Sequence, residues 1–402
     1  MTFVLQKLGD FGALANWPRA AVPILAQINE HIPQLCQLPH DYLLRDDPES
    51  MAECTLLVYE YYDVSLLIAN LDAYNFEAES MGQKISYATG RYPDIDRSDY
   101  LIKDKNDLDK IKFGGLESGR YPYLLKYVKA FRKYAGCYPA SDACAPWSLA
   151  ANIYGLDRLA LSAISDPGFT HEMLRRIIYD FMVPLYRAQL EVLPERRQYD
   201  LADAFASPPL VSPKIFRDYV VRYYDELCRA FEGADITFGI KGIWGVGVVP
   251  EKNREQFTDD LVHVTGGTLG GMDPDVANIG PQWYRDYADR KKVPMFLGLM
   301  TKLLEDGPVE AIVERVKHYT LTGKNGLTPF VFFLSNVAPA TPSEHVHAAV
   351  QAVRTFGQPE ADSSTSFQIK PRESFGDFVA WKKSNNPEGY SFKWLERSGL
   401  GR

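Results

Sequence analysis

The sequence predicts an α/β protein built as a parallel (β/α)8 barrel, with an N-terminal helical extension and a C-terminal tail. From about residue 63 onward, short apolar runs alternate with longer amphipathic stretches, the order in which strands and helices follow one another around a parallel sheet. Several runs are continuously apolar, which is typical of strands covered on both faces. The length of 402 residues suits an α/β barrel that carries additional segments.

Seven segments are predicted as the buried strands of this barrel. They are residues 64–71, 136–140, 198–203, 234–240, 260–265, 294–299 and 329–334. A closed barrel of this kind needs eight strands, so one strand is missed or irregular in the pattern.

Two of the helices between these runs have clear start signals. Ser212 and Pro213 open the segment SPKIFRDYVVRYYDELCRAFEG, where serine is expected as the N-cap and proline at the first helical position. Its apolar residues recur at spacings of three and four, which predicts one buried helix face. The sequence TPSE, which begins at Thr341, has the pattern of a capping box and predicts a helix that runs to about Val353.

The alternating pattern divides the chain into three parts. Residues 1–62 are rich in leucine, proline and charge and are expected to form a helical extension. Residues 63–357 are expected to form the catalytic barrel. Residues 358–402 begin with the polar run QPEADSSTS and then carry Phe375, Phe378, Trp381, Phe392 and Trp394. An aromatic tail of this kind is expected to pack on its own domain, because apolar surface is seldom left exposed.

Composition and charge narrow the classes of function. The formal charge of −8 disfavours nucleic acid or an anionic membrane as the main partner. The five cysteines form no CxxC pair, so neither a disulfide framework nor a zinc ribbon is indicated. The N-terminus lacks the pattern of a signal peptide, and no apolar run approaches the ~20 residues of a membrane span. These features predict a cytoplasmic protein.

Polar residues directly after apolar runs are the candidates for function, because the active site of a parallel barrel lies at the carboxyl ends of its strands. The polar candidates are Asp72, Asn75, Glu77, Asp142, Asp203, Lys241, His263 and Asn336, and two aromatic residues near predicted loop ends, Trp147 and Trp244, are candidates for the wall of an apolar cavity.

Several of these candidates also have a structural alternative. His263 lies within an apolar run, where it could be a hydrogen-bonded core histidine. Glu77 could be a capping or solvated carboxylate at a helix start. Asp142 and Asp203 could be helix caps. Trp147, like other aromatic residues of this sequence, could be a packing residue.

A set of segments in a fixed order resembles the uroporphyrinogen decarboxylase superfamily over about residues 63–357. The segments are LDAYNFEAESMGQKI, SGRYPYLLKYVKAF, APWSLAANIYG, SDPGFTHEMLRRI, LVSPKIFRDYVVRYYDEL, GGMDPDVANIGP, MFLGLMTKLLEDGPVEAIVERV and TPSEHVHAAVQAV. No single segment is specific, but their order and spacing are. The resemblance implies a TIM barrel and one of two functional branches, decarboxylases of tetrapyrroles or methyltransferases that use a corrinoid.

The residues favour the methyltransferase branch. True uroporphyrinogen decarboxylases carry an arginine-rich RQAGR motif near the N-terminus, whereas the early arginines here are Arg19 and Arg45, in ANWPRAAV and YLLRDDPE. The segment YNFEAESMG looks more like the methyltransferases. Their corrinoid usually sits on a separate small protein.

The zinc site common in that branch is not matched by this sequence. It consists of His-x-Cys after one strand and a second cysteine near the end of the barrel. The corresponding segment here reads TFGIKGIWG, and no cysteine follows Cys228. Zinc remains possible, but its usual ligands are absent. This favours demethylation of a methyl ether over transfer to a zinc-activated thiol.

The resemblance thus implies a corrinoid-dependent methyltransferase, an O-demethylase component. It would remove a methyl group from a small methoxylated, aromatic substrate and pass it to the cobalt of a corrinoid protein. Cleavage of an aryl ether needs an acid at the ether oxygen, and Glu77 and His263 are the first candidates for it, followed by Asp203. The expected substrate-binding residues are Asp72, Asn75, Asp142, Trp147, Lys241, Trp244 and Asn336.

Two other functions remain open, because a fold does not fix a function. One is a decarboxylase or other lyase on the same barrel. The other is a non-catalytic scaffold, suggested by the missing zinc ligands. The partners expected are the methylated substrate and the corrinoid protein, and a homodimer is possible.

Overall fold

The computed structural model describes residues 12–67, 72, 75–87, 92–139 and 142–401. Contacts divide the chain into two compact units. Unit 1 comprises residues 1–69, 126–139 and 268–402, and unit 2 comprises residues 70–125 and 140–267. Among the described residues, no helix has both the length and the apolar character needed to span a bilayer.

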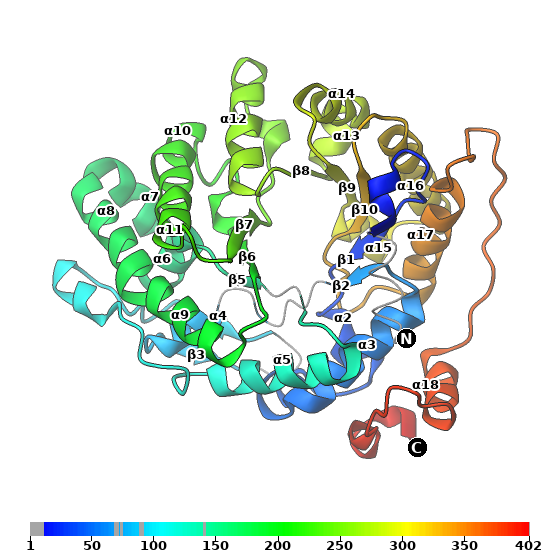
Figure 1. The fold of residues 1–402 in the computed structure, drawn as a ribbon, viewed down its shortest axis with the longest axis horizontal. Coiled ribbons are helices and arrows are strands. Elements are labelled where there is room, and N and C mark those ends of the chain that lie inside the picture. The colour runs from blue at the N-terminus through cyan, green and yellow to red at the C-terminus, as the bar shows by residue number, and fades with distance from the viewer. Residues whose placement is uncertain (1–11, 68–71, 73–74, 88–91, 140–141, 402) are drawn as a thin grey trace. The chain divides into compact units, whose positions relative to one another are not determined.

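Unit 1 is built on a five-stranded parallel sheet in the order β2-β1-β10-β9-β8 (Figure 1). The strands are β1 (Ile24–Ala26), β2 (Leu66–Leu67), β8 (Leu269–Met272), β9 (Met295–Leu299) and β10 (Phe330–Leu334). β1 lies between β2 and β10, with Leu25 opposite both Leu66 and Phe333. Most of the described apolar side chains on these strands are buried and none is exposed, as expected for a parallel sheet with covered faces.

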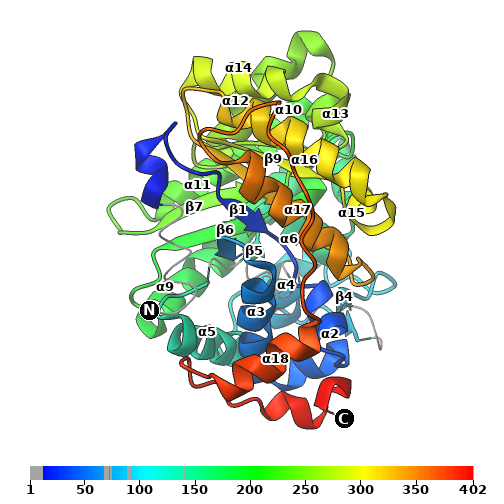
Figure 2. The ribbon, with the colours of Figure 1, turned by 90° about the vertical axis from the view of Figure 1, so that its right-hand side faces the viewer.

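Helices that follow the strands cover this sheet. The longest are α3, α16 and α17, and Figure 2 shows α16 and α17 side by side. The helices of unit 1 are η1 (Ala13–Asn16), α2 (His31–Leu35), η2 (Tyr42–Asp46), α3 (Pro48–Tyr62), α13 (Asp275–Ile279), α14 (Pro281–Lys291), α15 (Thr301–Asp306), α16 (Val309–Lys324), α17 (Ser343–Phe356), α18 (Phe375–Ser384), η8 (Lys393–Glu396) and η9 (Gly399–Gly401).

Unit 2 contains a three-stranded parallel sheet in the order β5-β6-β7. The strands are β5 (Asp142–Cys144), β6 (Gln198–Ala202) and β7 (Thr237–Lys241). Ala202 lies opposite Cys144 on one side and Lys241 on the other, so these three residues mark the carboxyl ends of the strands. A short antiparallel pair, β3 (Ile85–Ser86) with β4 (Asp94–Ile95), also belongs to this unit.

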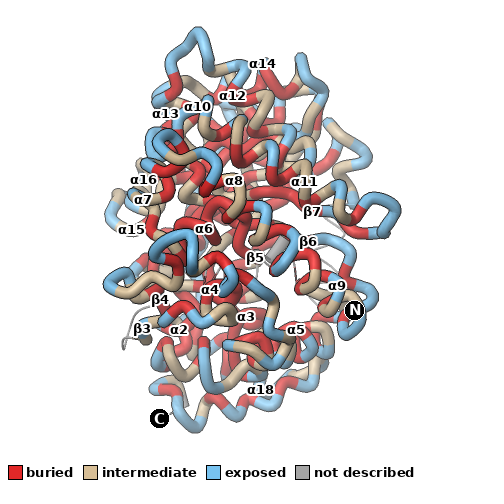
Figure 3. The backbone as a smooth tube through the Cα atoms, turned by 90° about the vertical axis from the view of Figure 1, so that its left-hand side faces the viewer, coloured by how far each residue is buried: buried red, intermediate tan, exposed pale blue. Residues whose placement is uncertain are grey.

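The helices of unit 2 are mainly those that connect its strands. α6, which follows β5, is buried along almost its entire length, as the red tube in Figure 3 shows. They are α4 (Asn75–Ser80), η3 (Lys105–Lys110), α6 (Pro146–Tyr154), α7 (Leu156–Ser165), α8 (Pro167–Arg176), η4 (Ile177–Met182), α9 (Val183–Val192), η5 (Ala204–Ala206), α10 (Pro213–Ile215), η6 (Phe216–Val221), α11 (Arg222–Ala230), η7 (Val246–Val248) and α12 (Glu251–Val264); α5 (Tyr121–Ala135) begins in unit 2 and ends in unit 1.

Four predicted strands are confirmed to within three residues at either end, as β6, β7, β9 and β10. The predicted strand 64–71 is confirmed at β2, while its residues 68–71 lie outside the described part of the chain. The segment 136–139 is not a strand, and β5 begins at Asp142 instead. The unassigned strand is β1, in the segment 1–62 for which only helices were expected.

The prediction of a strand at residues 260–265 is wrong. These residues are the end of α12, in which Phe257, Leu261 and Val264 are buried at spacings of four and three. A short window of this helix, LVHV, looks like an apolar run because His263 is the one polar residue that its exposed side contributes to the window. The true strand is β8, which contains two glycines and is less apolar.

The described parallel strands thus number five in one unit and three in the other. A closed barrel would also need β2 paired with β5 and β7 paired with β8. Neither pairing is among those of the described residues, so closure of the barrel stays a prediction.

The helix starts are confirmed at one place and corrected at another. The Ser212 hydroxyl accepts a hydrogen bond from the Ile215 N–H at 3.2 Å, as expected of an N-cap. The helix predicted after Thr341 is α17, but Pro342 is its N-cap and makes no side-chain cap. A capping box needs a side-chain oxygen on the N-cap residue, and proline has none.

The C-terminal tail packs on unit 1. Trp394 is fully buried, and the Glu53 carboxylate of α3 accepts hydrogen bonds from the N–H groups of Ser391 and Phe392. The buried Lys382 of α18 forms ion pairs with Glu60 and Glu388, each at 3.0 Å. The tail is therefore an integral layer of this unit.

Candidate functional site

Asp203 follows β6 directly and is fully buried. Its Oδ1 atom accepts two hydrogen bonds from Ser148, one from the backbone N–H at 2.9 Å and one from the hydroxyl at 2.6 Å. Its Oδ2 atom is buried without a hydrogen-bond partner among the described residues. One oxygen of this carboxyl is therefore fixed, and the other is available for a proton.

The local sequence explains why Asp203 takes this position. The N-cap residue of α6 is Ala145, whose side chain cannot accept a hydrogen bond, and Pro146 occupies the first turn. The free N–H groups at the start of a helix need an acceptor, and Asp203 supplies it from the neighbouring strand. The structural alternative for Asp203, a helix cap, is thus fulfilled by Oδ1 alone.

Burial raises the pKa of Asp203 from 3.8 to about 7, because the carboxylate is removed from water while the two hydrogen bonds from Ser148 offset only part of that penalty. No cation contributes to the shift. Near neutral pH a substantial fraction of this group is therefore an uncharged acid.

Asp72 and Arg120 form a buried ion pair in the same unit. The Arg120 guanidinium donates to Asp72 Oδ2 and, through Nε, to Glu79 Oε2 at 2.6 Å. It also lies 4.4 Å from the centre of the Phe76 ring. Asn75 donates to Asp72 Oδ1 and to the Pro93 carbonyl, the latter at 2.7 Å. Arg120 thus ties α4 to the turn before α5.

Asp72 remains mainly charged at neutral pH despite its burial. Burial raises its pKa to about 6, while Arg120 and Asn75 act in the opposite direction. The neighbouring Glu79 accepts a second hydrogen bond, from the Tyr87 hydroxyl at 2.8 Å. This part of the site is a network of fixed charges.

Glu77 lies on α4 and is 4 % exposed. Burial raises its pKa from 4.5 to about 7, the nearby Asp72 raises it further, and hydrogen bonds from its own backbone N–H and that of Cys144 lower it. Burial also raises the pKa of the Cys144 thiol, and the negative charges of Glu77, Asp203 and Asp72 add to that effect. All three carboxyl groups therefore lie near Cys144, at the end of β5.

We refer to Asp72, Glu77 and Asp203 as the buried acid cluster. It combines two acids whose pKa lies near 7 with one carboxylate that is paired with arginine. Carboxyl groups whose pKa lies near the working pH can donate or accept a proton during a reaction. Four predicted site residues, Asp72, Asn75, Glu77 and Asp203, are thus brought into one region of unit 2.

The other predicted residues of unit 2 lie at strand or helix ends. The Trp147 indole is 1 % exposed and donates to the Phe205 carbonyl at 3.2 Å, so it is a packing residue. Lys241 ends β7, and its ammonium donates to the Thr265 carbonyl at 3.0 Å. The backbone N–H of Trp244 donates to the Ser207 hydroxyl.

His263 does not belong to this region. It lies on α12 and pairs with Asp225 of α11, with a distance of 2.7 Å between Nε2 and Oδ1 and with 53 % of the side chain exposed. Its expected place at the end of a strand is therefore wrong, and we do not retain it as the acid. The cause is the helix that was mistaken for a strand.

Two further predictions are left open. Asn336 follows β10 of unit 1, is exposed and has a φ of 44°. Asp142 is the first residue of β5, opposite Asp200; its side chain lies outside the described part of the structure.

Three residues of the site escaped the sequence reasoning, namely Glu79, Arg120 and Ser148. They lie in helices or directly before one, whereas the predicted site residues were chosen for their position after apolar runs. Arg120 and Ser148 stand in SGRYPYLL and APWSLAAN, two segments of the family resemblance, so a search of those segments for polar residues would have found them.

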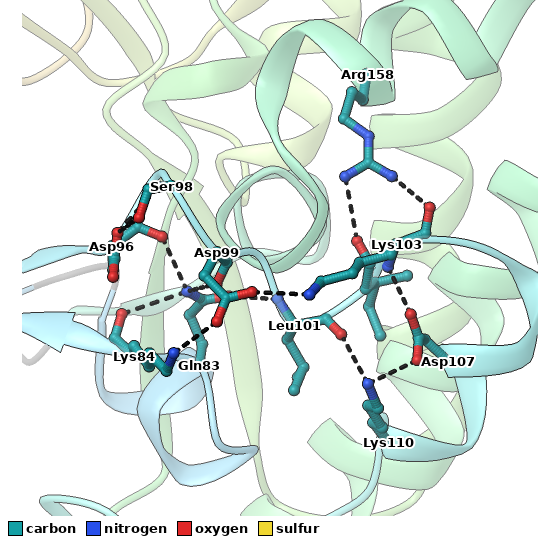
Figure 4. Close-up of polar contacts among 11 residues, drawn as sticks. Gln83, Lys84, Asp96, Ser98, Asp99, Leu101, Lys103, Asp107, Lys110 and Arg158 are labelled. Carbon is teal, nitrogen blue, oxygen red and sulfur yellow. Dashed lines mark hydrogen bonds and ion pairs between the residues drawn. The ribbon is translucent and has the colours of Figure 1, made fainter.

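A second group of charges in unit 2 differs strongly from the acid cluster. Lys84, Asp96, Asp99, Lys103, Asp107 and Lys110 form what we call the loop cluster, shown in Figure 4. Asp99 contacts Lys84 at 2.6 Å and Lys103 at 2.9 Å. These two ammonium groups lower the pKa of Asp99 to about 2.

The loop cluster has a structural role. The Gln83 side chain contacts the backbone at Asp99 and Leu101, and Arg158 of α7 donates to the carbonyl groups of Ile102 and Lys103 (Figure 4). Its lysines are exposed, and its carboxylates are held by those lysines and by nearby N–H and hydroxyl groups, so it fixes a surface loop.

A metal site was not specified by the sequence. Among the described residues, no three histidine, cysteine, aspartate or glutamate side chains are grouped as a metal would require. At the segment TFGIKGIWG the structure places β7 with Lys241, whose ammonium is bound to a carbonyl. These residues do not fit the zinc site of the methyltransferase branch.

Comparison with known proteins gives a family and a structural neighbour. The model of the family "Uroporphyrinogen decarboxylase (URO-D)" matches residues 42–356. A solved structure of a methyltransferase from Methanosarcina mazei is similar in fold, with a TM-score of 0.68 and 19 % sequence identity; the match covers 89 % of this chain and 99 % of that one. No curated protein matches the sequence.

Proposed function

This chain belongs to the uroporphyrinogen decarboxylase family, and within that family we propose that it is a corrinoid-dependent methyltransferase. The proposed reaction removes a methyl group from a small methoxylated aromatic compound and passes it to the cobalt of a separate corrinoid protein. The structural neighbour from Methanosarcina mazei is a methyltransferase, which supports methyl transfer over decarboxylation. The five free cysteines suit the cytoplasm, where thiols stay reduced.

The observation that carries the proposal is the Asp203 carboxyl group, which has a pKa of about 7 and a free Oδ2 atom. Demethylation of an aryl ether breaks the bond between the methyl carbon and an oxygen that leaves as a phenolate. A proton delivered to that oxygen as the bond breaks makes it a better leaving group. Asp203 is a neutral acid in much of the protein at pH 7, and its proton would reside on Oδ2.

The remaining residues of the cluster have distinct proposed roles. Glu77, with a pKa also near 7, is the second group able to hold a proton in the site. Asp72 and Asn75 would orient the substrate, with Arg120 holding Asp72 in the charged form. Lys241 and Trp244, which follow β7, are proposed as further substrate contacts.

The corrinoid is assigned to a carrier protein, and when that protein binds it supplies the cobalt centre that accepts the methyl group. The contribution of this chain is to bind the ether, to exclude water around its oxygen and to hold the proton at Asp203. Because the residues at β7 do not fit zinc, the proposed reaction contains no zinc-dependent step.

The test is to incubate the purified protein with reduced cob(I)alamin and a panel of methoxylated aromatic compounds. The visible spectrum is followed for the appearance of methylcobalamin, and the free phenol is quantified in the same samples. The assay is repeated with the cognate corrinoid protein and with Asp203→Asn, which keeps the size of the side chain and removes the acid. We expect methylcobalamin and phenol in equal amounts from wild type, and a large loss in the variant.

Other outcomes separate the alternatives. Release of carbon dioxide from a carboxylated substrate, without a corrinoid, would establish a lyase. The early arginines do not support a tetrapyrrole substrate, since Arg19 is exposed and Arg45 is paired with Asp46 on the surface. If neither product forms with the carrier protein present, the methyltransferase proposal fails.

A further inference from the structure

Unit 1 contains a cavity of about 400 Å³ between α17 and an extended segment of the C-terminal tail. We call this segment, residues 367–372, the strap. In Figures 1 and 2 the strap is part of the extended stretch that connects α17 to α18. Gln351 of α17 holds it through both amide atoms, which bond to the backbone N–H and carbonyl of Lys370 at 2.8 and 2.9 Å.

The chain is anchored to the rest of unit 1 both before and after the strap. Before it, the Lys324 ammonium donates to the carbonyls of Gln358 and Ala361, and after it the Tyr61 hydroxyl donates to the Glu373 carbonyl at 2.9 Å. Phe367 contacts the Phe356 ring, with centroids 5.7 Å apart. The strap is therefore a fixed wall.

The charge of the cavity is opposite to that of the protein. Its lining includes the cations Arg354, Lys370 and Arg372 and a single carboxylate, Asp63, whereas the chain as a whole carries −8. Asp63 is paired with Arg354, with a distance of 3.4 Å between Oδ2 and Nε. The positive charges of Lys370 and Arg372 are therefore not balanced by a carboxylate of the lining.

The cations differ in how they are held. Arg354 is positioned by the Asp63 carbonyl at 2.8 Å and the Ser65 hydroxyl at 3.1 Å. In contrast, the side chains of Lys370 and Arg372 are exposed and have no ion pair within the described part of the chain. Two unpaired cations that face one cavity attract an anion of matching charge.

The walls indicate what the anion is attached to. Val350 and Phe367 contribute apolar surface beside the cations, and the volume of about 400 Å³ lies within the range of small-molecule pockets. A dianionic group balances the two surplus charges, and an apolar body fills the side formed by Phe367.

We propose that the cavity between α17 and the strap binds a small organic phosphate monoester, with its phosphate at Lys370 and Arg372 and its organic part against Phe367. This site lies entirely within unit 1 and does not depend on the function proposed for the buried acid cluster.

The test uses isothermal titration calorimetry of the whole protein with phenyl phosphate, inorganic phosphate and phenol. We expect phenyl phosphate to bind at least about ten-fold more tightly than inorganic phosphate, and phenol to bind not at all. Equal affinity for phenyl phosphate and inorganic phosphate would overturn the organic ester as the ligand. Absence of binding by either phosphate would overturn the site.

Variants locate the binding. The double variant K370Q/R372Q removes the two unpaired cations, and K383Q/K393Q removes the same charge from exposed positions of the same unit outside the cavity. We expect a loss of about ten-fold or more in affinity for the first and less than about two-fold for the second. An equal loss in both would mean unspecific attraction and would overturn the proposal. Circular dichroism checks that both variants are folded.

A proton resonance gives an independent readout. His347 of α17 is buried, and Arg372 contributes to the low pKa of its ring, about 4. An anion bound at Arg372 changes the field at this ring, so the His347 resonance should shift on addition of phenyl phosphate in wild type and in K383Q/K393Q. An unchanged His347 resonance in a saturated wild-type sample would place the ligand elsewhere and overturn the assignment.

Discussion

Unit 2 contains two groups of carboxylates whose proton affinities have moved in opposite directions. In the loop cluster, Asp99 is partly exposed and lies beside two ammonium groups, and its pKa falls to about 2. In the buried acid cluster, Asp203 is fully buried and no cation contributes to its shift, and its pKa rises to about 7. Asp72 is intermediate, at about 6, because it is buried but paired with Arg120. Hydration and a counter-cation together decide which aspartate can act as an acid.

The largest difference in the rate of methyl transfer should lie between two variants. One removes the acid Asp203 from the buried acid cluster, and the other removes its exposed counterpart Asp99 from the loop cluster. Asp203→Asn should lower the rate of methyl transfer by about 10²- to 10⁴-fold, the usual contribution of a general acid. Asp99→Asn should leave the rate within about two-fold, because that carboxylate is charged and remote from proton transfer. The methylcobalamin assay measures both. Equal activity of Asp203→Asn and wild type would refute the role of Asp203.

The next largest effect should be on the free energy of unfolding, when a buried arginine and an exposed arginine are each removed. Arg120→Met leaves the buried Asp72 carboxylate without its partner and should lower the free energy of unfolding by about 3–5 kcal/mol. The control is Arg97→Met, which breaks an exposed pair with Asp94 and should cost no more than about 1 kcal/mol. Urea denaturation monitored by circular dichroism compares them. Similar losses in both variants would show that the burial of Arg120 has no energetic consequence.

The pH dependence of stability sharpens the same comparison. Asp203 ionises near pH 7 in the folded state but near its ordinary value of 3.8 when unfolded, so between these values the unfolded state binds fewer protons. Stability should therefore fall as the pH rises from about 4 to about 7, by at most about 4 kcal/mol for this group alone. Glu77, whose pKa is also raised, acts in the same direction.

Asp203→Asn removes this titration while it keeps an oxygen for the hydrogen bonds from Ser148. The variant should match wild type near pH 4 and be more stable than wild type at pH 8. Thermal unfolding at a series of pH values provides the measurement. A variant that is less stable than wild type at pH 8 would contradict the raised pKa.

The smallest effect is expected in the loop cluster. Lys84→Met removes one of two ammonium groups beside Asp99, both of which are exposed. The midpoint of thermal unfolding should change by no more than about 1 °C, and any change should vanish at high salt. A drop of several degrees would mean that this surface network contributes more than its exposure suggests.

The sequence was informative where a polar residue directly follows a strand. Asp203 could be predicted because β6 is regular and the active site of such folds lies at strand ends. The family resemblance placed Asn75 and Glu77 in YNFEAESMG, and both lie in the buried region. For β9 and β10, five-residue apolar runs gave the strand positions directly.

Other features depend on contacts that no local pattern reveals. β1 has only three residues and is defined by its partners β2 and β10 rather than by its own sequence. The window LVHV of α12 reads as a strand because its exposed face is narrow there, and His263 was misplaced as a result. Arg120 was missed because its role depends on Asp72 and Glu79, which lie 48 and 41 residues away in the chain.

The position of β1 between β2 and β10 also has a consequence for biosynthesis. β1 pairs with β2 soon after both leave the ribosome, but its other edge must wait for Phe332, roughly 300 residues later, which corresponds to tens of seconds of translation. All residues of unit 2 are made in that interval. During this time β1 keeps an unpaired edge, a known template for wrong pairing. Nascent chains that end before residue 330 should therefore depend most on chaperones.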